Sequence, residues 1–332
     1  MKLPSIHDIE KARKNISGSI HRTPVLKSKQ INEITGAELF IKCENFQKVG
    51  AFKFRGAVNA ILNLPDELKR KGVATHSSGN HAQALALAAR MIGVRAAIVM
   101  PSNSPEVKKK AVEGYGADVV LCEPNLKARE STLAEVIAEN GAAEIHPYKN
   151  FDVISGQGTA ALELMEDAGD LDIFMTPVGG GGLTGGCSTA VKSLKKRTKF
   201  FAVEPKGADD AYRSFKSGNW VASEEPDTIC DGLLTSTGEI NFEIIKKNVD
   251  DILTVSDSTV LKAMKLYFER MKIVTEPSGA VTLAAVLEYP ELFAGKRTGL
   301  VISGGNIDIS RFGYFFHGSS FRQVEDKRNA DK

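Results

Sequence analysis

The residue of this sequence best suited to covalent chemistry is a lysine set between two phenylalanines. Lys53 lies in the run Ala51-Phe52-Lys53-Phe54-Arg55. Apolar neighbours disfavour the charged form of a lysine and lower its pKa, which frees the amine to attack a carbonyl carbon. A lysine in such a setting more often extends its amine to water, so this run alone does not decide the chemistry. Lys53 is therefore a candidate for a Schiff base if other motifs supply a ligand with a carbonyl group.

A glycine-rich stretch provides a candidate site for a phosphate. Gly179, Gly180, Gly181 and Gly182 follow an apolar strand-like run and precede a helix-like run. Without side chains, these residues let a ligand approach the backbone closely, and they reach backbone angles that cost other residues free energy. The unpaired N–H groups at the start of a helix and the positive end of the helix dipole together favour an anion.

The same stretch permits a second interpretation, a dinucleotide site. Gly180, Gly182 and Gly185 fit the spacing G-x-G-x-x-G. Glu204 ends the next strand-like run, at about the separation expected of an acid that binds a ribose. An oxidoreductase that uses a nicotinamide dinucleotide therefore remains open at this point, as does a loop that only turns the chain.

Three further loops carry polar groups where strand-like runs end. The first, Ser77-Ser78-Gly79-Asn80-His81, offers hydroxyls and an amide at a helix start, which suit a carboxylate but would also cap a helix. The second begins with Ser303 and continues as Gly-Gly-Asn, where a turn explains the glycines but not the serine. In the third, Glu204, Asp210 and the carbonyl of Ala208 are oxygen ligands for Mg²⁺ or Ca²⁺, or else solvated surface groups.

Taken together, these motifs favour one class of enzyme over the alternatives. A nucleophilic lysine, a phosphate site and an amino-acid site are the three parts of an enzyme that uses pyridoxal phosphate. A dinucleotide enzyme gives no role to Lys53 or Ser303 and becomes the distant alternative. A catalytically silent sensor of amino acids or nucleotides leaves the lysine equally unexplained.

These loops need a scaffold that brings the ends of several strands together. Short apolar strands alternate with amphipathic helices, as in parallel sheets covered by helices on both faces, and ligands bind beyond the carboxyl ends of such strands. We therefore expect an α/β fold with two lobes, each a mostly parallel twisted sheet flanked by helices. The tail over 318–332 is expected to be disordered. Single helices are expected over 56–68 and 258–271.

The composition points to a small-molecule enzyme. The chain has 43 basic and 41 acidic residues and a net charge of +2, so neither nucleic acid nor a membrane surface is expected as a partner. Its four cysteines are far apart and form no C-x-x-C pair, which favours a reducing compartment. The amino terminus lacks the apolar core of a signal peptide, and no run approaches the roughly 18 apolar residues of a membrane span. We expect a soluble cytoplasmic protein.

From the motif that begins at His21 to the one that ends at Asn306, the chain resembles the tryptophan-synthase-β-like, or fold type II, pyridoxal phosphate enzymes. Within them it is most similar to the branch of serine racemases and threonine/serine dehydratases. The motifs that carry the resemblance are Lys42-Cys-Glu-Asn-Phe-Gln, Ala51-Phe-Lys-Phe-Arg-Gly-Ala, Ser77-Ser-Gly-Asn-His-Ala-Gln, Ser155-Gly-Gln-Gly-Thr, the four glycines, Glu204-Pro-Lys-Gly-Ala-Asp-Asp, Glu276-Pro-Ser-Gly-Ala and Ser303-Gly-Gly-Asn.

The resemblance implies a role for each motif. Lys53 would hold the cofactor as a Schiff base, Asn80 would bond its phenolic oxygen, and Ser303 would face its ring nitrogen. The implied cofactor-binding residues are Phe52, Lys53, Asn80, Gly179, Gly180, Gly181, Gly182, Leu183 and Ser303; the implied substrate-binding residues are Ser77, Ser78, Asn80, His81 and Arg129; and the implied ligands of a structural, activating Mg²⁺, Ca²⁺ or Mn²⁺ are Glu204, Ala208 and Asp210.

The resemblance also implies an activity. Lys53, once freed, would take the Cα proton of the substrate, and racemisation needs a second acid, for which Ser78 is the candidate. Threonine dehydratases typically carry Ser-Ala-Gly-Asn-His at this loop, whereas serine racemases carry Ser-Ser-Gly-Asn-His, as this chain does. We therefore expect a serine racemase with accompanying serine and threonine dehydratase activity. A dedicated threonine dehydratase or 3-hydroxyaspartate dehydratase is the alternative, and Arg129 could reach a second substrate carboxylate.

The chain departs from the branch at its nucleotide effector site. Val49 and Lys29 replace hydroxyl residues that line this site in animal serine racemases, so the resemblance gives no firm expectation of ATP as an effector. The resemblance does imply a homodimer. It also implies a large cofactor-binding domain (1–69 plus 150–317), a small domain (70–149) and a site in the cleft between the two.

Overall fold

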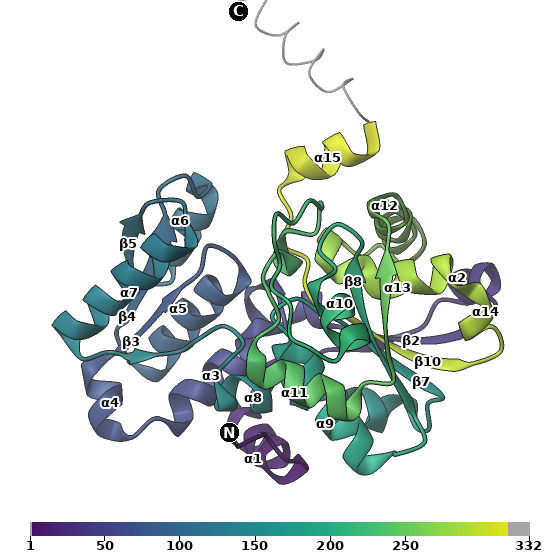
Figure 1. Ribbon diagram of the computed structural model, residues 1–332, viewed down its shortest axis with the longest axis horizontal. Coiled ribbons are helices and arrows are strands. Elements are labelled where there is room, and N and C mark those ends of the chain that lie inside the picture. The colour runs from purple at the N-terminus through teal and green to yellow at the C-terminus, as the bar shows by residue number, and fades with distance from the viewer. Residues whose placement is uncertain (1, 318–332) are drawn as a thin grey trace, which may run out of the picture.

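Two sheets that lie side by side form the framework of the computed structural model, which describes residues 2–317 (Figure 1). The tail expected to be disordered, 318–332, lies outside these described residues. In Figure 1 the four-stranded sheet lies on the left and the six-stranded sheet on the right, each with its own helices. The predicted α/β class, with parallel sheets flanked by helices, is confirmed.

The six-stranded sheet has the strand order β1-β2-β10-β7-β8-β9, in which only β1 and β2 pair antiparallel. Successive residues of its strands point to opposite faces, so Phe174 enters one core and its neighbours Ile173 and Met175 enter the other. Both faces are therefore apolar and need helices to cover them. The strands are β1 (Val25–Leu26), β2 (Glu38–Cys43), β7 (Ile173–Pro177), β8 (Lys199–Pro205), β9 (Asp251–Val255) and β10 (Arg297–Ile302).

The four-stranded sheet is entirely parallel and has the order β5-β4-β3-β6. Here too alternate residues separate two cores, since Val73 packs on one side of β3 and Ala74 on the other. Its strands are β3 (Val73–His76), β4 (Ala96–Pro101), β5 (Asp118–Cys122) and β6 (Ala143–Glu144).

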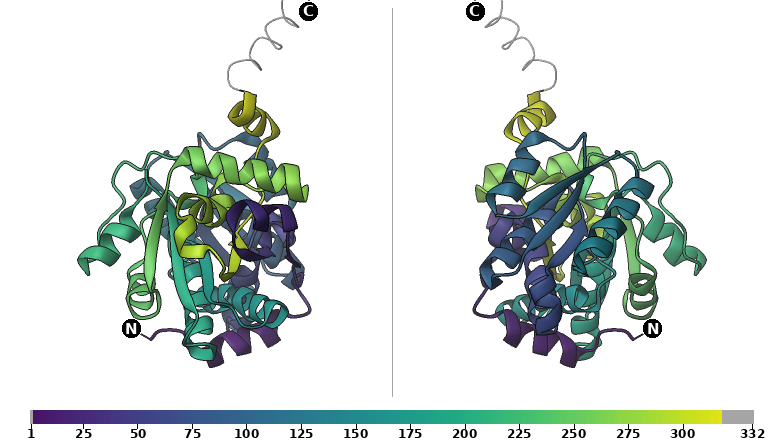
Figure 2. Two further views of the ribbon diagram at one scale, coloured as in Figure 1. Left: turned by 90° about the vertical axis from the view of Figure 1, so that its right-hand side faces the viewer. Right: turned by 90° about the vertical axis from the view of Figure 1, so that its left-hand side faces the viewer.

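Helices cover both faces of each sheet, as the side views show (Figure 2). One face of the large sheet packs against α2 (Lys29–Thr35), α12 (Asp257–Leu266), α13 (Pro277–Glu288) and α14 (Pro290–Phe293). The other packs against α1 (Ile6–Ile16), α8 (Phe151–Ala168), α9 (Gly182–Leu194), α10 (Asp210–Ser217) and α11 (Glu239–Asn248). The small sheet lies between α7 (Leu126–Asn140) and a layer of α3 (Lys53–Asn63), α5 (Asn80–Ile92) and α6 (Glu106–Gly114). The remaining helices are α4 (Asp66–Lys71) and α15 (Ile309–His317).

Two predicted helices differ from the observed ones. The helix expected over 56–68 is divided into α3 and α4, because Pro65 has no N–H to donate and holds Leu64 in an extended conformation, with ψ at 143°. The helix expected over 258–271 is regular only to Leu266, and its last turn, Tyr267–Met271, widens into a π-helix. The composition of a segment predicts that it is helical more reliably than it predicts where the helix ends.

A buried cluster of charges fixes the helix that carries Lys53. Arg55 is fully buried, and its Nε and Nη1 donate to Glu44 at 2.7 Å and to Glu163 at 2.8 Å. Lys42 donates to the other oxygen of Glu163 at 2.6 Å. Buried charges are tolerated only when they are paired, so these bonds hold the first turn of α3 in a fixed place against β2 and α8.

The polar loops singled out in the sequence follow the carboxyl ends of β3, β7, β8 and β10. Parallel strands direct these ends toward one edge of their sheet, which is where a site is expected.

All four cysteines lie within the described part of the chain and are buried and free. Among helices of the described residues, none has both the length and the apolar character that crossing a membrane requires.

Candidate active site

Lys53 is the first residue of α3, and its amine lies in partly buried surroundings. Its Nζ donates to the carbonyl of Pro147 at 2.9 Å and lies 5.2 Å from the ring centre of Phe52 and 6.0 Å from that of Tyr148. Burial lowers the pKa of Lys53 to about 8, and the carboxyl of Glu276 acts against this shift. At neutral pH a larger share of this amine is uncharged than in an ordinary lysine, as a nucleophile requires.

The glycine loop connects β7 to α9, which confirms the predicted sequence of strand, loop and helix. A Cβ on Gly180 would lie 2.3 Å from ring atoms of Tyr148, and one on Gly181 would lie 2.7 Å from the Cβ of Asn241. Gly181 also has a φ of +84°, which other residues rarely adopt. Among the described residues, no acceptor bonds the backbone N–H groups of 179–183, so they are free for an anion.

The side-chain amide of Asn80 is held from two directions. Its Oδ1 accepts from Nδ2 of Asn306 at 2.9 Å, and its Nδ2 donates to the two carboxyl oxygens of Glu276 at 2.9 and 3.2 Å. Burial raises the pKa of Glu276 to about 8, and repulsion from Asp231 adds to the shift. The motifs around Glu276 and Asn306 are visible in the sequence, but their contact with Asn80 is not.

The loop between β3 and α5 contains Ser77 and Ser78, both partly exposed. The hydroxyl of Ser77 accepts from the backbone N–H of Gly79 at 3.3 Å. His81 is buried one turn further on, where its Nε2 lies 2.8 Å from the carbonyl of Ile145. Burial lowers the pKa of His81 to about 3, so the ring is neutral. His81 is thus part of the buried support of this loop, whereas Ser77 and Ser78 are partly exposed to solvent.

Ser303 lies at the end of β10, next to the segment that leads into Lys53. Its backbone carbonyl accepts from the N–H of Phe52 at 3.0 Å. Its buried hydroxyl lies 3.4 Å from the carbonyl of Ser278, a long hydrogen bond. This hydroxyl is therefore weakly engaged by the protein and is available to a ring nitrogen.

Two aromatic residues that the sequence analysis did not select complete the surroundings of Lys53. His146 and Tyr148 follow β6, with their ring centres 4.6 Å apart and the rings edge to face. Nδ1 of His146 accepts the backbone N–H of Lys149 at 3.0 Å, and burial lowers the pKa of this histidine to about 3. The signal that could have found them is their position after a strand of the small sheet.

Arg129, on α7, lies near His76, the last residue of β3, whose ring centre is 6.0 Å from that of His146. Burial lowers the pKa of His76, and the opposing charges of Glu130 and Arg129 act on it as well. Nε of Arg129 is buried with no hydrogen-bond partner among the described residues. A guanidinium with a free buried donor is suited to a carboxylate.

The three residues assigned to a cation lie together near the end of β8. One oxygen of Glu204 accepts from the N–H of Tyr212 at 2.6 Å, and one oxygen of Asp210 accepts from the N–H of Thr237 at 2.9 Å. The second oxygen of each carboxylate is buried without a partner among the described residues. Burial raises the pKa of Glu204 and raises that of Asp210 to about 6.

These orphaned oxygens and the carbonyl of Ala208 fit a divalent cation, because hard oxygen ligands would otherwise remain buried without compensation. Within 2–317 no group of three or more His, Cys, Asp or Glu side chains could hold a metal, so the carbonyl and water would have to complete the coordination. The carboxyl of Glu204 is buried and accepts from the backbone N–H of Tyr212, which weakens its interpretation as an acid that binds a ribose.

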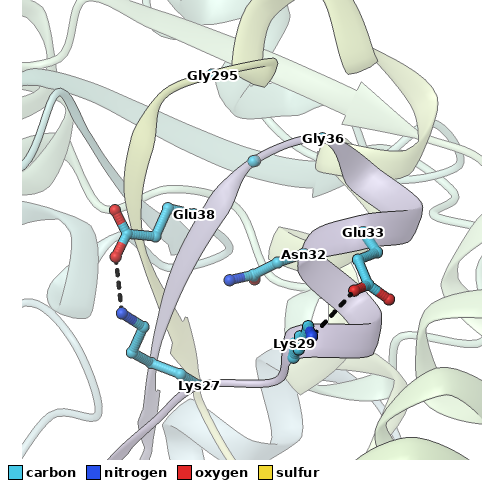
Figure 3. A pocket seen from close by; sticks show the side chains of 8 residues that line it. Lys27, Lys29, Asn32, Glu33, Gly36, Glu38 and Gly295 are labelled. Atoms are coloured by element: carbon cyan, nitrogen blue, oxygen red, sulfur yellow. Dashed lines mark hydrogen bonds and ion pairs between the residues drawn. The ribbon is translucent and has the colours of Figure 1, made fainter.

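Other hollows of the described surface lie away from these groups. The one drawn in Figure 3 has a volume of about 600 Å³ and lies between α2 and β2. Its charged side chains are already paired, Lys27 with Glu38 at 2.7 Å and Lys29 with Glu33 at 3.8 Å. The hydrogen bond from Lys27 lowers the pKa of Glu38 and keeps this carboxylate charged, and we assign the hollow no chemistry.

The residues around Lys53 fit pyridoxal phosphate. The amine has a lowered pKa, and the N–H groups of the glycine loop have no partner among the described residues. Asn306 and Glu276 hold the side-chain amide of Asn80 in a fixed orientation, and the hydroxyl of Ser303 is only weakly engaged by the protein. These are the partners that an aldehyde, a phosphate, a phenolic oxygen and a ring nitrogen require.

Comparison with known proteins gives the same picture. Residues 16–304 match the family described as pyridoxal-phosphate dependent enzyme. A serine racemase of Dictyostelium discoideum is 50% identical over 314 residues, 93% of this chain and 97% of that protein. A beta-hydroxyaspartate dehydratase of Paracoccus denitrificans is 47% identical over 311 residues, 94% of this chain and 99% of that protein. The crystal structure of the Dictyostelium serine racemase superposes with a TM-score of 0.88 and covers 92% of this chain and 99% of that one.

Proposed function

Because the chain belongs to the pyridoxal-phosphate dependent enzyme family, in the fold type II branch with serine racemases and threonine deaminases, we propose that it is a serine racemase. It would interconvert L- and D-serine and also eliminate ammonia from L-serine and L-threonine. The observation that carries the proposal is the Ser-Ser-Gly-Asn-His loop, in which Ser78 is partly exposed two positions before Asn80.

In this proposal each part of the cofactor has a partner in the chain. Lys53 and Phe52 hold the aldehyde end, Asn80 the phenolic oxygen and Ser303 the ring nitrogen. The phosphate is held by the N–H groups of Gly179, Gly180, Gly181, Gly182 and Leu183. When bound, pyridoxal phosphate acidifies the Cα–H bond of an amino acid that is joined to its aldehyde carbon.

Two side chains then move the proton. Nζ of Lys53, whose pKa is lowered to about 8, takes the Cα proton from one face. Oγ of Ser78 gives a proton from the opposite face, which inverts the configuration. If the β-hydroxyl leaves before that proton is returned, the outcome is elimination. Ser77 and His81 complete the loop that receives the substrate carboxylate.

Product analysis tests the proposed substrate. The holoenzyme is incubated separately with L-serine, D-serine, L-threonine and the threo and erythro forms of 3-hydroxyaspartate, and the enantiomers, keto acids and ammonia are measured. Formation of D-serine from L-serine, together with pyruvate, supports the proposal. Turnover of hydroxyaspartate without any D-serine would contradict it and favour the dehydratase.

The guanidinium of Arg129, whose Nε has no partner within 2–317, favours a second candidate, a 3-hydroxyaspartate dehydratase, because it could bind the second carboxylate of that substrate. We expect Arg129→Ala to raise KM for 3-hydroxyaspartate at least about tenfold, as for a lost charged hydrogen bond. KM for L-serine should change little, and Arg129→Lys should restore part of the difference. Equal changes in KM for both substrates would show that Arg129 does not select a dicarboxylate.

We also propose that Glu204, Asp210 and the Ala208 carbonyl bind Mg²⁺, Ca²⁺ or Mn²⁺. Removal of the cation with a chelator should lower the Tm by several degrees, since a ligand at 100 times its Kd stabilises a protein by about 2.7 kcal/mol. Added Mg²⁺ or Ca²⁺ should restore the Tm of the wild type but not that of Asp210→Asn, measured by thermal unfolding. A chelated wild type with an unchanged Tm would contradict the assignment.

The proposal includes the organisation expected from the sequence. Residues 70–149 would form the small domain and 1–69 with 150–317 the large one, with the site in the cleft between them. The enzyme would act on small molecules as a cytoplasmic homodimer. Size-exclusion chromatography with light scattering tests the dimer.

A further inference from the structure

One segment bonds the carbonyl groups of the glycine loop. The hydroxyl of Thr237 donates to the carbonyl of Gly179 at 2.9 Å. The carbonyl of Gly180 accepts twice, from the N–H of Gly238 at 3.1 Å and from Nδ2 of Asn241 at 2.6 Å. These donors lie in the loop before α11 and in its first turn.

These bonds decide where the N–H groups of the loop point. In a trans peptide the C=O and the following N–H point in opposite directions. Holding the carbonyls of Gly179 and Gly180 toward α11 therefore turns the N–H groups of Gly180 and Gly181 away from it. Glycine peptides have no side chain to restrict their rotation, so this orientation has to be imposed by other residues.

The side chains of Thr237 and Asn241 are polar, yet both are buried. Thr237 is 1% exposed and Asn241 is fully buried. Nδ2 of Asn241 bonds the carbonyls of both Gly180 and Tyr148, the latter at 2.8 Å, while its Oδ1 is left without a partner among the described residues. An apolar side chain would avoid the cost of that unpaired oxygen, so the amide is best explained by the two carbonyls that it bonds.

We propose that Thr237 and Asn241 are positioning residues for the phosphate of the cofactor. They hold the carbonyls of the glycine loop away from the bound anion, and Asn241 ties the loop to Tyr148, the aromatic residue beside Lys53. Neither side chain touches the phosphate. The proposal rests on the proposed use of pyridoxal phosphate and assigns to that site two residues that are distant from its motifs in the sequence.

The test compares two ligands that differ only in the phosphate. Apoenzyme of the wild type, Thr237→Val and Asn241→Leu is titrated with pyridoxal 5′-phosphate and with pyridoxal, and the visible absorbance of the lysine-bound ligand is followed. We expect the affinity for pyridoxal 5′-phosphate to fall about tenfold in each variant, as for a lost hydrogen bond. The affinity for pyridoxal should stay within twofold of the wild type.

Thr198→Val is the matched control. Thr198 is also a buried threonine whose hydroxyl donates to a backbone carbonyl, that of Leu171 at 2.8 Å. It directly precedes β8, at the edge of the sheet opposite to the glycine loop, which follows the parallel strand β7. It should leave both affinities unchanged. The inference is overturned if Thr237→Val binds pyridoxal 5′-phosphate like the wild type, or if both ligands weaken equally. A wild type that takes up neither ligand would instead refute the proposed function, and with it this inference.

Discussion

Replacement of Lys53 by alanine should give a protein that stays colourless with pyridoxal phosphate and loses racemisation and elimination together, by at least about a thousandfold. The variant lacks the amine that binds the aldehyde, and it lacks the base that takes the Cα proton, a contribution of about 10²–10⁴ on its own. Absorbance titration measures the first loss, and assays of D-serine and pyruvate measure the second.

Lys48→Ala is the matched control for this change. Lys48 lies five positions earlier in the sequence, and its amine is 5.7 Å from the ring centre of Phe54, so it also has an aromatic neighbour. It should bind the cofactor and turn over L-serine like the wild type. Full turnover in Lys53→Ala, or equal losses in both variants, would contradict the role given to Lys53.

Replacement of Ser78 by alanine should separate the two reactions. Without its hydroxyl, no proton reaches the face of Cα opposite to Lys53, so D-serine formation from L-serine should fall about 100-fold or more. Elimination from L-serine needs only Lys53 as a base and should stay within a few-fold of the wild type. Chiral analysis of serine and a pyruvate assay on the same samples measure both rates.

The reverse substrate supplies the control for the Ser78 variant. D-serine presents its Cα proton to Ser78, so elimination from D-serine should fall together with racemisation, while elimination from L-serine in the same preparation shows that the protein is folded. If all three rates fall alike, Ser78 has a structural role. If all three survive, the proposal of two bases is wrong.

The sequence predicted well those features that a few neighbouring residues encode. The glycine loop follows β7 and opens α9 as expected, because the apolar strand-like run before the four glycines and the helix-like run after them are each encoded locally. The α/β class and the family were likewise accessible, since both depend on local motifs and on the alternation of strands and helices. Helix ends were less accessible, and the division at Pro65 shows that one residue can override the periodicity of its neighbours.

Contacts between distant segments were beyond the reach of sequence. Asn80 and Glu276 are 196 positions apart, and Thr237 and Gly179 are 58 positions apart. No periodicity relates such pairs, and only the packing of helices on the two sheets brings them within hydrogen-bond distance.

The sequence by itself thus determined which residues are reactive: an amine among phenylalanines, a run of glycines, and hydroxyls at the ends of strands. The tertiary structure decided how deeply those groups are buried, how their pKa values shift and which hydrogen bonds they make. It partly buries Lys53 and lowers its pKa to about 8, leaves one oxygen of Asp210 without a partner in the described part of the chain, and turns the carbonyls of the glycine loop toward α11. The physical reason is that the identity of a group belongs to its residue, whereas its solvation and its hydrogen-bond partners depend on where the rest of the chain is packed.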